Sequence, residues 1–188
     1  TTLGILRSGC LPVYTDVAKD GLMDFTSDCF QSALADASVV IPVHLFGFPC
    51  DLQALKSLSD ASHCFVIEDC AQSIGASYNG IPTGTVGTAA VMSFYPTKNL
   101  GALGDAGAAI TSNPTIASRI RAIRNYGQTK KNENTLFGMN SRLDELHAAI
   151  LDKVLLPRLN AWIDRREEIA RYYLENISHP MIQLPTVA

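Results

Sequence analysis

The sequence predicts an α/β fold in which a mostly parallel, mixed sheet lies between helices in a three-layer arrangement. Two observations predict it. Residues 39–41 and 65–67 are apolar at consecutive positions, which is typical of parallel strands that are covered on both faces. Helical stretches separate these apolar runs along the chain, and such alternation favours right-handed crossover connections within one sheet.

Strands and helices are predicted from short apolar runs and from capping signals. Strands are expected at Leu11–Val17, Val39–Phe46, Cys64–Glu68, Ala89–Tyr95 and Ala106–Thr111. Helices are expected at Ser27–Ala35, Asp51–Ser59 and Pro114–Asn125. Asp51 can cap the second of these helices, and proline suits the first position of the third.

The later part of the chain contains a turn signal and then long helices. Asn79-Gly80 is a strong signal for a two-residue hairpin turn. A helix is expected to start at Ser141 with Asp144 as its capping-box partner, because apolar residues follow at helical spacing. Pro157 should kink or break that helix, and a second helical run, 158–176, follows it.

Composition argues against several kinds of partner and site. The 188 residues carry a formal net charge of −3 and are 47% hydrophobic, which is typical of a globular protein without the basic face that nucleic acid requires. No apolar run reaches the roughly 18–20 residues of a membrane span, and the first residues have no signal-peptide pattern. The five cysteines contain no C-x-x-C pair and the four histidines lie far apart. We therefore expect reduced thiols, no metal centre and a cytoplasmic location.

Two acids follow a strand of the buried type. The run of residues 64–67 leads directly into Glu68 and Asp69. In parallel α/β sheets, ligands bind at the carboxyl ends of strands, so an acid placed there can contact a bound molecule. The alternative is that Asp69 caps the start of a helix. The segment by itself leaves both interpretations open.

A lysine and a glycine-rich run follow the strand predicted at 89–95. The glycines after Lys98 fit neither the dinucleotide-binding fingerprint nor the P-loop. Ser93 and Lys98 are five positions apart, which also differs from the S-x-x-K motif. A lysine beyond a strand is most often solvent-exposed. The chemistry that remains for it is a Schiff base, which requires an accessible neutral amine near walls of low polarity.

Segments along the whole chain carry a family resemblance. They are Ile41-Pro42-Val43-His44-Leu45-Phe46-Gly47, Glu68-Asp69-Cys70-Ala71-Gln72, Ser93-Phe94-Tyr95-Pro96-Thr97-Lys98-Asn99-Leu100-Gly101, Arg124-Asn125-Tyr126-Gly127 and Gly138-Met139-Asn140-Ser141-Arg142-Leu143-Asp144-Glu145-Leu146. In this order they resemble the DegT/StrS group of sugar-nucleotide aminotransferases, which are fold type I enzymes that use pyridoxal 5'-phosphate (PLP). The resemblance implies the large, cofactor-binding domain of that fold.

The resemblance also implies a role for each motif residue in the cofactor site. Lys98 would hold PLP as a Schiff base. Asp69 would face the pyridine nitrogen and keep it protonated, and Gln72 would hydrogen-bond the 3′-oxygen of the cofactor. Ala71 would lie near a face of the ring, and Ser93 would bind the phosphate.

Other polar residues have both a role at the site and a structural alternative. By resemblance, Asn140 would reach across a homodimer interface to the cofactor phosphate of the partner subunit; the alternative is an N-terminal helix cap. Tyr95 and Asn99 would line the site, with packing or turn roles as the alternative. Glu68 is the weaker acid candidate and is expected to be structural.

The resemblance implies transamination in two halves. L-glutamate would donate the amino group, Lys98 would act as general base and acid, and the acceptor would be a nucleotide-linked keto sugar, best matched by a dTDP-linked 3-keto-6-deoxyhexose. Related dehydratases carry histidine at the position of Lys98, so the lysine favours a transaminase over a dehydratase. The alternatives are an aminotransferase acting on a 4-keto sugar or a cyclitol, and a non-catalytic relative or inactive fragment.

The chain is expected to be part of a longer enzyme. Residues 1–140 would form the central part of the PLP-binding domain, 141–176 would be helices bridging to a small C-terminal domain, and 177–188 would begin that domain with a new strand near its end. A phosphate-binding helix N-terminus and much of the substrate pocket would then lie outside the chain. We expect the 188 residues alone to bind PLP weakly or not at all and to show no turnover.

Overall fold

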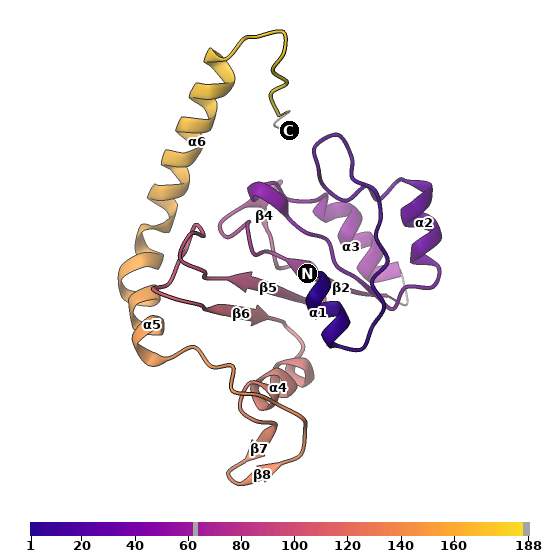
Figure 1. Cartoon of the computed structure of the whole chain (residues 1–188), viewed down its shortest axis with the longest axis vertical. Coiled ribbons are helices and arrows are strands. Elements are labelled where there is room, and N and C mark those ends of the chain that lie inside the picture. Colours follow the sequence, from indigo (N-terminus) through magenta and orange to yellow (C-terminus); the bar gives the residue numbers. More distant parts are fainter. Residues whose placement is uncertain (62–63, 186–188) are drawn as a thin grey trace.

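A computed structural model describes residues 1–61 and 64–185 of the chain. Its main sheet has the strand order β1 (Val39–Val40), β2 (Phe65–Asp69), β5 (Ala89–Ser93) and β6 (Gly107–Ile110). The first three strands are parallel, and β6 pairs antiparallel with β5. The prediction of an α/β fold with a mostly parallel, mixed sheet is therefore confirmed (Figure 1).

The helices between the strands begin at side chains that cap their first turns, Asp51 among them as predicted. They are α2 (Asp28–Leu34), α3 (Leu52–Ala61) and α4 (Pro114–Ile123). The side chain of Ser27 accepts a hydrogen bond from a backbone N–H in the first turn of α2, as Asp51 does for α3 and Asn113 for α4. These side chains satisfy N–H groups that have no partner inside the helix. All three predicted helices are confirmed to within two residues at each end.

Two small hairpins project from this framework. They are formed by β3 (Ser77–Tyr78) with β4 (Ile81–Pro82), and by β7 (Gln128–Lys130) with β8 (Glu133–Asn134). Asn79 and Gly80 both have positive φ angles, 50° and 78°, as a type I′ turn requires. The Asn79-Gly80 turn is therefore confirmed, whereas the second hairpin and the helix α1 (Thr2–Arg7) were not predicted.

The helices after residue 144 form a long, interrupted rod. It consists of α5 (Glu145–Ile150), a π-helical turn (Leu151–Leu155), a 3₁₀ turn (Leu156–Arg158) and α6 (Leu159–Asn176). Asp144 is the N-cap, with its carboxylate accepting the N–H of His147 at 2.8 Å, so the predicted start at Ser141 is wrong. Pro157 lies in the 3₁₀ turn and interrupts the α-helix as predicted. Residues 186–188, in the predicted last strand, lie outside the described residues.

Two strand predictions need correction. Residues 11–17 form no strand and make only an isolated bridge, between Val17 and Met23, because no described strand pairs with them. The strand predicted from Val39 to Phe46 ends at Val40. Pro42 has no N–H for a ladder, and a 3₁₀ turn, Leu45–Gly47, follows it.

Helices α2 and α3 bury one face of the sheet. Leu52 and Leu55 of α3 pack with Val66 of β2, and Phe30 of α2 packs near Val40 of β1. The opposite face is open. Phe65 is 60% exposed there, and Val39 and Val91 are partly exposed. Within the described residues, no helix covers this part of the second face, whereas the α/β arrangement with a mixed sheet is as predicted.

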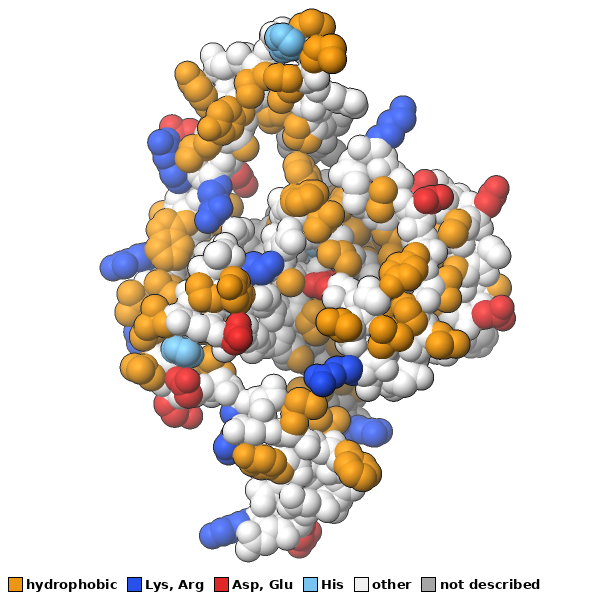
Figure 2. All heavy atoms as spheres, in the orientation of Figure 1, with side chains coloured by type: hydrophobic (Ala, Val, Ile, Leu, Met, Phe, Trp, Pro, Cys, Tyr) orange, Lys and Arg blue, Asp and Glu red, His pale blue; other side chains and the backbone are white. Residues whose placement is uncertain are grey.

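A second apolar cluster joins the π-helical turn and α6 to the loops at the other end of the sheet. Leu151 and Leu159 pack there with Ile74, Leu100 and Ala102. The rod thus fixes the loop that follows β5. Apolar side chains remain exposed along α5 and α6 and over α1 (Figure 2). None of the helices in the described residues has both the length and the apolar composition to cross a bilayer.

Candidate functional site

Asp69 and Ser93 lie on the same face of the sheet, at the carboxyl ends of the neighbouring strands β2 and β5. Asp69 ends β2 and is the register partner of Val91 in the parallel strand β5. Ser93 lies two residues beyond Val91, and side chains two apart on a strand point to the same face. Lys98 follows in the loop after β5, whose arrow points towards α5 and α6 (Figure 1). The carboxyl ends of β2 and β5 therefore carry an acid and a hydroxyl on one face, and a lysine follows in the loop directly after β5.

Asp69 is buried but only partly satisfied. Its side chain is 8% exposed. One carboxylate oxygen accepts the backbone N–H of Ala71 at 3.1 Å, and the other accepts the hydroxyl of Thr1 at 2.6 Å. Residues 71–76 form turns, so the helix-cap interpretation of Asp69 is wrong. Each carboxylate oxygen can accept about two hydrogen bonds, and Asp69 can accept more.

The amide of Gln72 is oriented by the chain before it. Its Oε1 accepts the backbone N–H of Phe46 at 3.0 Å. Because an N–H can only meet the oxygen of the amide, this bond leaves the NH₂ group of Gln72 as the available donor. Phe46 has φ 57° and ψ 17°, a left-handed conformation that is strained for an aromatic residue and is often found at functional sites.

The loop after β5 is a closed turn. The hydroxyl of Ser93 accepts the N–H of Tyr95 at 3.3 Å, and the Lys98 N–H donates to the Tyr95 carbonyl at 2.8 Å. A Cβ at Gly101 would collide with the carbonyl oxygen of Pro96, so this close backbone approach needs glycine. The loop presents Lys98 with little freedom of its backbone.

The side chain of Lys98 is half-buried. Within residues 1–61 and 64–185, its ammonium group has no hydrogen bond and no ion pair. The residues after Lys98 are anchored, because Leu100 and Ala102 are 5% and 3% exposed in the apolar cluster with the π-helical turn and α6. An anchored loop with an unpaired amine suits a residue that must bond to a ligand.

Glu68, next to Asp69, is the centre of a closed hydrogen-bond network on the other face of β2. Its carboxylate accepts Nε2–H of His44 at 3.0 Å and the backbone N–H groups of Gly84, Val86 and Gly87 at 2.7, 2.8 and 2.7 Å. Burial would raise the pKa of Glu68, but these hydrogen bonds outweigh it and lower the pKa to about 2. The expected structural role of Glu68 agrees with this arrangement.

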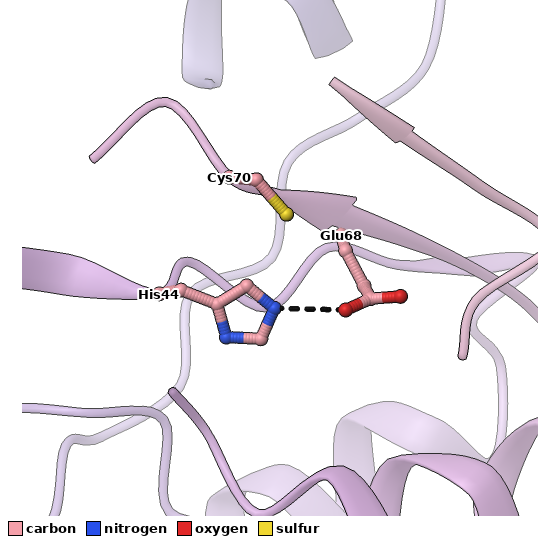
Figure 3. A group of neighbouring side chains, drawn as sticks. All are labelled: His44, Glu68 and Cys70. Atoms are coloured by element: carbon pink, nitrogen blue, oxygen red, sulfur yellow. Dashed lines mark hydrogen bonds and ion pairs between the residues drawn. The ribbon is translucent and has the colours of Figure 1, made fainter. Parts of the chain in front are cut away.

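Cys70 completes a cluster of metal-ligand type with His44 and Glu68, and their ligand atoms lie within 4.8 Å of one another (Figure 3). However, Nδ1 of His44 accepts the N–H of Cys50 at 3.0 Å, so its other nitrogen carries the proton donated to Glu68. Burial raises the pKa of the Cys70 thiol to about 11. With these lone pairs occupied and the thiol protonated, the cluster is suited to holding backbone segments together.

Asn140 has no hydrogen bond to the other predicted site residues within the described part of the chain. It is exposed on the segment between β8 and α5, where it bridges to Asn125, and its Oδ1 accepts Nε of Arg142 at 3.1 Å. It does not cap the following helix, since Asp144 does so. A role for Asn140 towards a partner subunit remains a prediction.

Sequence reasoning missed two contributors to the site. Thr1 and the backbone of Phe46 contact Asp69 and Gln72 across 68 and 26 residues of chain. Thr1 stands in no quoted motif, and Phe46 lies in a resemblance segment that gave it no role at the site, because the importance of both arises from which distant residue each one contacts. A covariation signal between the paired positions could have indicated them.

The fold defines the class of protein. The chain superposes on the crystal structure of DesV from S. venezuelae, described as a complex with a ketimine intermediate, with a TM-score of 0.92 and 39% identity over 99% of this chain and 50% of that one. The sheet and its flanking helices are thus those of a fold type I aminotransferase.

The chain belongs to the DegT/DnrJ/EryC1/StrS aminotransferase family, whose sequence model matches residues 1–186. It is 41% identical over 98% of its length to the erythromycin biosynthesis sensory transduction protein EryC1 of Saccharopolyspora erythraea, covering 50% of that protein. It is 52% identical over 79% of its length to the dTDP-3-amino-3,6-dideoxy-alpha-D-galactopyranose transaminase of Aneurinibacillus thermoaerophilus, covering 40% of it. The chain spans about half the length, or less, of these curated relatives.

Proposed function

We propose that this chain forms the cofactor-binding part of a PLP-dependent aminotransferase that aminates a nucleotide-linked keto sugar. The observation that carries the proposal is that Asp69 and Ser93 end the neighbouring parallel strands β2 and β5, with Gln72 and Lys98 in the turns that directly follow these strands. Family membership and the transaminase relative with 52% identity support it. We further propose L-glutamate as the donor and a homodimer as the working form.

The donors and acceptors at this edge fit the functional groups of PLP. The buried carboxylate of Asp69 suits the protonated ring nitrogen, and the free NH₂ of Gln72 suits the ring oxygen. Ser93 offers a hydroxyl to the phosphate, and Ala71 would pack against a ring face. When bound, PLP supplies an electron sink for the carbanion formed at the amino-bearing carbon.

Lys98 would perform two tasks. Its amine, unpaired within the described residues, would bond covalently to the cofactor and hold it in place. Once an amino donor displaces it, the same amine would take a proton from the substrate carbon and deliver it to the aldehyde carbon of the cofactor. The anchored loop between Ser93 and Ala102 supports both tasks, because it keeps the amine close to where the proton moves.

We propose a dTDP-linked 3-keto-6-deoxyhexose as the acceptor. The name of the Aneurinibacillus relative describes a 3-amino-dideoxy sugar on dTDP, which supports this class over 4-keto sugars and cyclitols. By family resemblance, Asn140 would contact the cofactor phosphate in the partner subunit. Its exposure supports a role at an interface between subunits.

The test uses the full-length protein. After reconstitution with PLP and reduction with borohydride, peptide mapping should find the cofactor on the peptide containing Lys98. Attachment elsewhere, or no attachment, would contradict the proposal. A screen of dTDP-linked 3-keto and 4-keto sugars with L-glutamate, monitored by 2-oxoglutarate release, should show turnover with the 3-keto sugar. The fragment of residues 1–188 is expected to bind PLP weakly and to show no turnover.

A second candidate is a non-catalytic relative with a regulatory role. The EryC1 protein, 41% identical, is named as a sensory transduction protein. Lys98 argues against loss of the active site, because a scaffold would not need an unpaired amine in a closed loop. PLP attachment without turnover for any keto sugar would favour this candidate.

A further inference from the structure

Thr1 precedes the first turn of α1 as its N-cap, but its side chain does not cap that helix. A threonine at this position usually accepts a hydrogen bond from an N–H of its own first turn. Here the hydroxyl instead donates to the carboxylate of Asp69 at 2.6 Å. This bond joins α1 to the end of β2, 68 residues away in sequence.

The bond is not part of a packed core. No residue of α1 is buried, and Leu3 is 75% exposed. The hydroxyl therefore bonds the buried acid without a fully buried apolar side chain on its own helix, in which Ile5 is only half-buried. A bond that links an exposed helix to a buried carboxylate is better explained by what it does to the carboxylate.

The two oxygens of Asp69 are held from different directions. The Ala71 N–H, in the turn that follows β2, holds one oxygen at 3.1 Å, and the Thr1 hydroxyl holds the other at 2.6 Å. Rotation about the last torsion of an aspartate is soft and roughly two-fold. One anchor would leave the plane of the carboxylate free to turn, whereas two anchors fix it.

We propose that Thr1 is a positioning residue for Asp69. By fixing the carboxylate plane, it aims the remaining acceptor capacity of Asp69 at the ring N–H of an aromatic cation. This inference rests on the proposed function, because the ring is that of PLP. Thr1 itself acts only through Asp69.

The test is a double-mutant cycle in the full-length protein, read as the dissociation constant of PLP from the apoprotein. Thr1→Val keeps the shape of the side chain and removes the hydroxyl. It should weaken PLP binding about tenfold, the effect of losing a hydrogen bond to a charged group. Thr1→Ser should restore binding to within about twofold. In an Asp69→Ala background, Thr1→Val should cause little further loss, because residues that act together are not additive.

A PLP analogue with carbon in place of the ring nitrogen separates positioning from a general structural effect. Thr1→Val should leave the affinity for this deaza analogue nearly unchanged. Equal weakening of PLP and of the analogue, or a full loss that persists in the Asp69→Ala background, would overturn the inference. The thermal midpoint of each apoprotein identifies variants that fail to fold, and Thr1→Ser then carries the comparison with the parent protein.

Failure of the inference can be distinguished from failure of the proposed function. If the unsubstituted protein does not attach PLP at Lys98, the proposed function fails. If attachment occurs and the cycle shows no coupling between Thr1 and Asp69, only the positioning role is wrong.

Discussion

Glu68 and Asp69 are adjacent acids at the end of β2, and their surroundings differ completely. Glu68 is fully buried, and four hydrogen-bond donors surround it. Asp69 has two donors and can accept more. Because successive strand residues point to opposite faces, one strand end carries a saturated carboxylate on its closed face and an unsaturated one on its open face. The difference shows that the Glu68 side holds backbone segments together, and it supports the proposal that the Asp69 side performs chemistry.

On the open face, Lys98→Ala should have the largest effect. It removes both the covalent attachment of PLP and the group that moves the proton, so turnover should fall by at least about a thousandfold. The measurement is initial rate together with borohydride trapping. Lys131→Ala, at an exposed turn lysine, is the matched control and should keep both. Normal turnover by Lys98→Ala would remove the basis for assigning chemistry to this face.

On the closed face, Glu68→Gln should reduce stability. The amide NH₂ would face backbone N–H donors that now meet a carboxylate oxygen, and the loss should be about 3 kcal/mol in the free energy of unfolding. Urea denaturation measures it, with Glu133→Gln, at an exposed acid, as the control. A loss below roughly 1 kcal/mol would show that the network around Glu68 contributes little.

Gln72→Glu tests the proposed cofactor site, and its expected effect on PLP binding is smaller than that of Lys98→Ala. Glutamate keeps an acceptor for the N–H of Phe46 but lacks the NH₂ donor, so PLP affinity should fall about tenfold while stability is kept. Gln72→Met removes both the donor and the acceptor, and it should also loosen the turn at Phe46. If Gln72→Glu binds PLP as well as the parent protein does, the amide is not a cofactor donor.

Acid should selectively weaken the closed face. The pKa of Glu68 is about 2 in the folded protein against an ordinary value of 4.5. A lowered pKa contributes stability that is fully present above about pH 4.5 and is lost as the pH falls towards 2. The gap in urea midpoint between the parent protein and Glu68→Gln should therefore narrow from about pH 6 to about pH 3. A gap in urea midpoint that stays constant with pH would mean that Glu68 has a similar pKa in the folded and unfolded states.

Local sequence patterns predicted the strands and helices that need only local information. Helices α2, α3 and α4 begin at side chains that cap their own first turns, and β2, β5 and β6 are short apolar runs bounded by turns. The Asn79-Gly80 turn follows from the steric freedom of two positions. The strand predicted at residues 11–17 does not form, because an apolar run becomes a strand only when another strand pairs with it.

The sequence by itself determined the family, and it predicts which residues perform chemistry, since the motifs that carry the resemblance contain Asp69, Gln72, Ser93 and Lys98. Only the tertiary structure decided which acid is closed off, because Glu68 and Asp69 differ in their distant partners. His44 reaches Glu68 across 24 residues, and Thr1 reaches Asp69 across 68. Such pairings depend on how the whole chain packs, which no short stretch of sequence encodes.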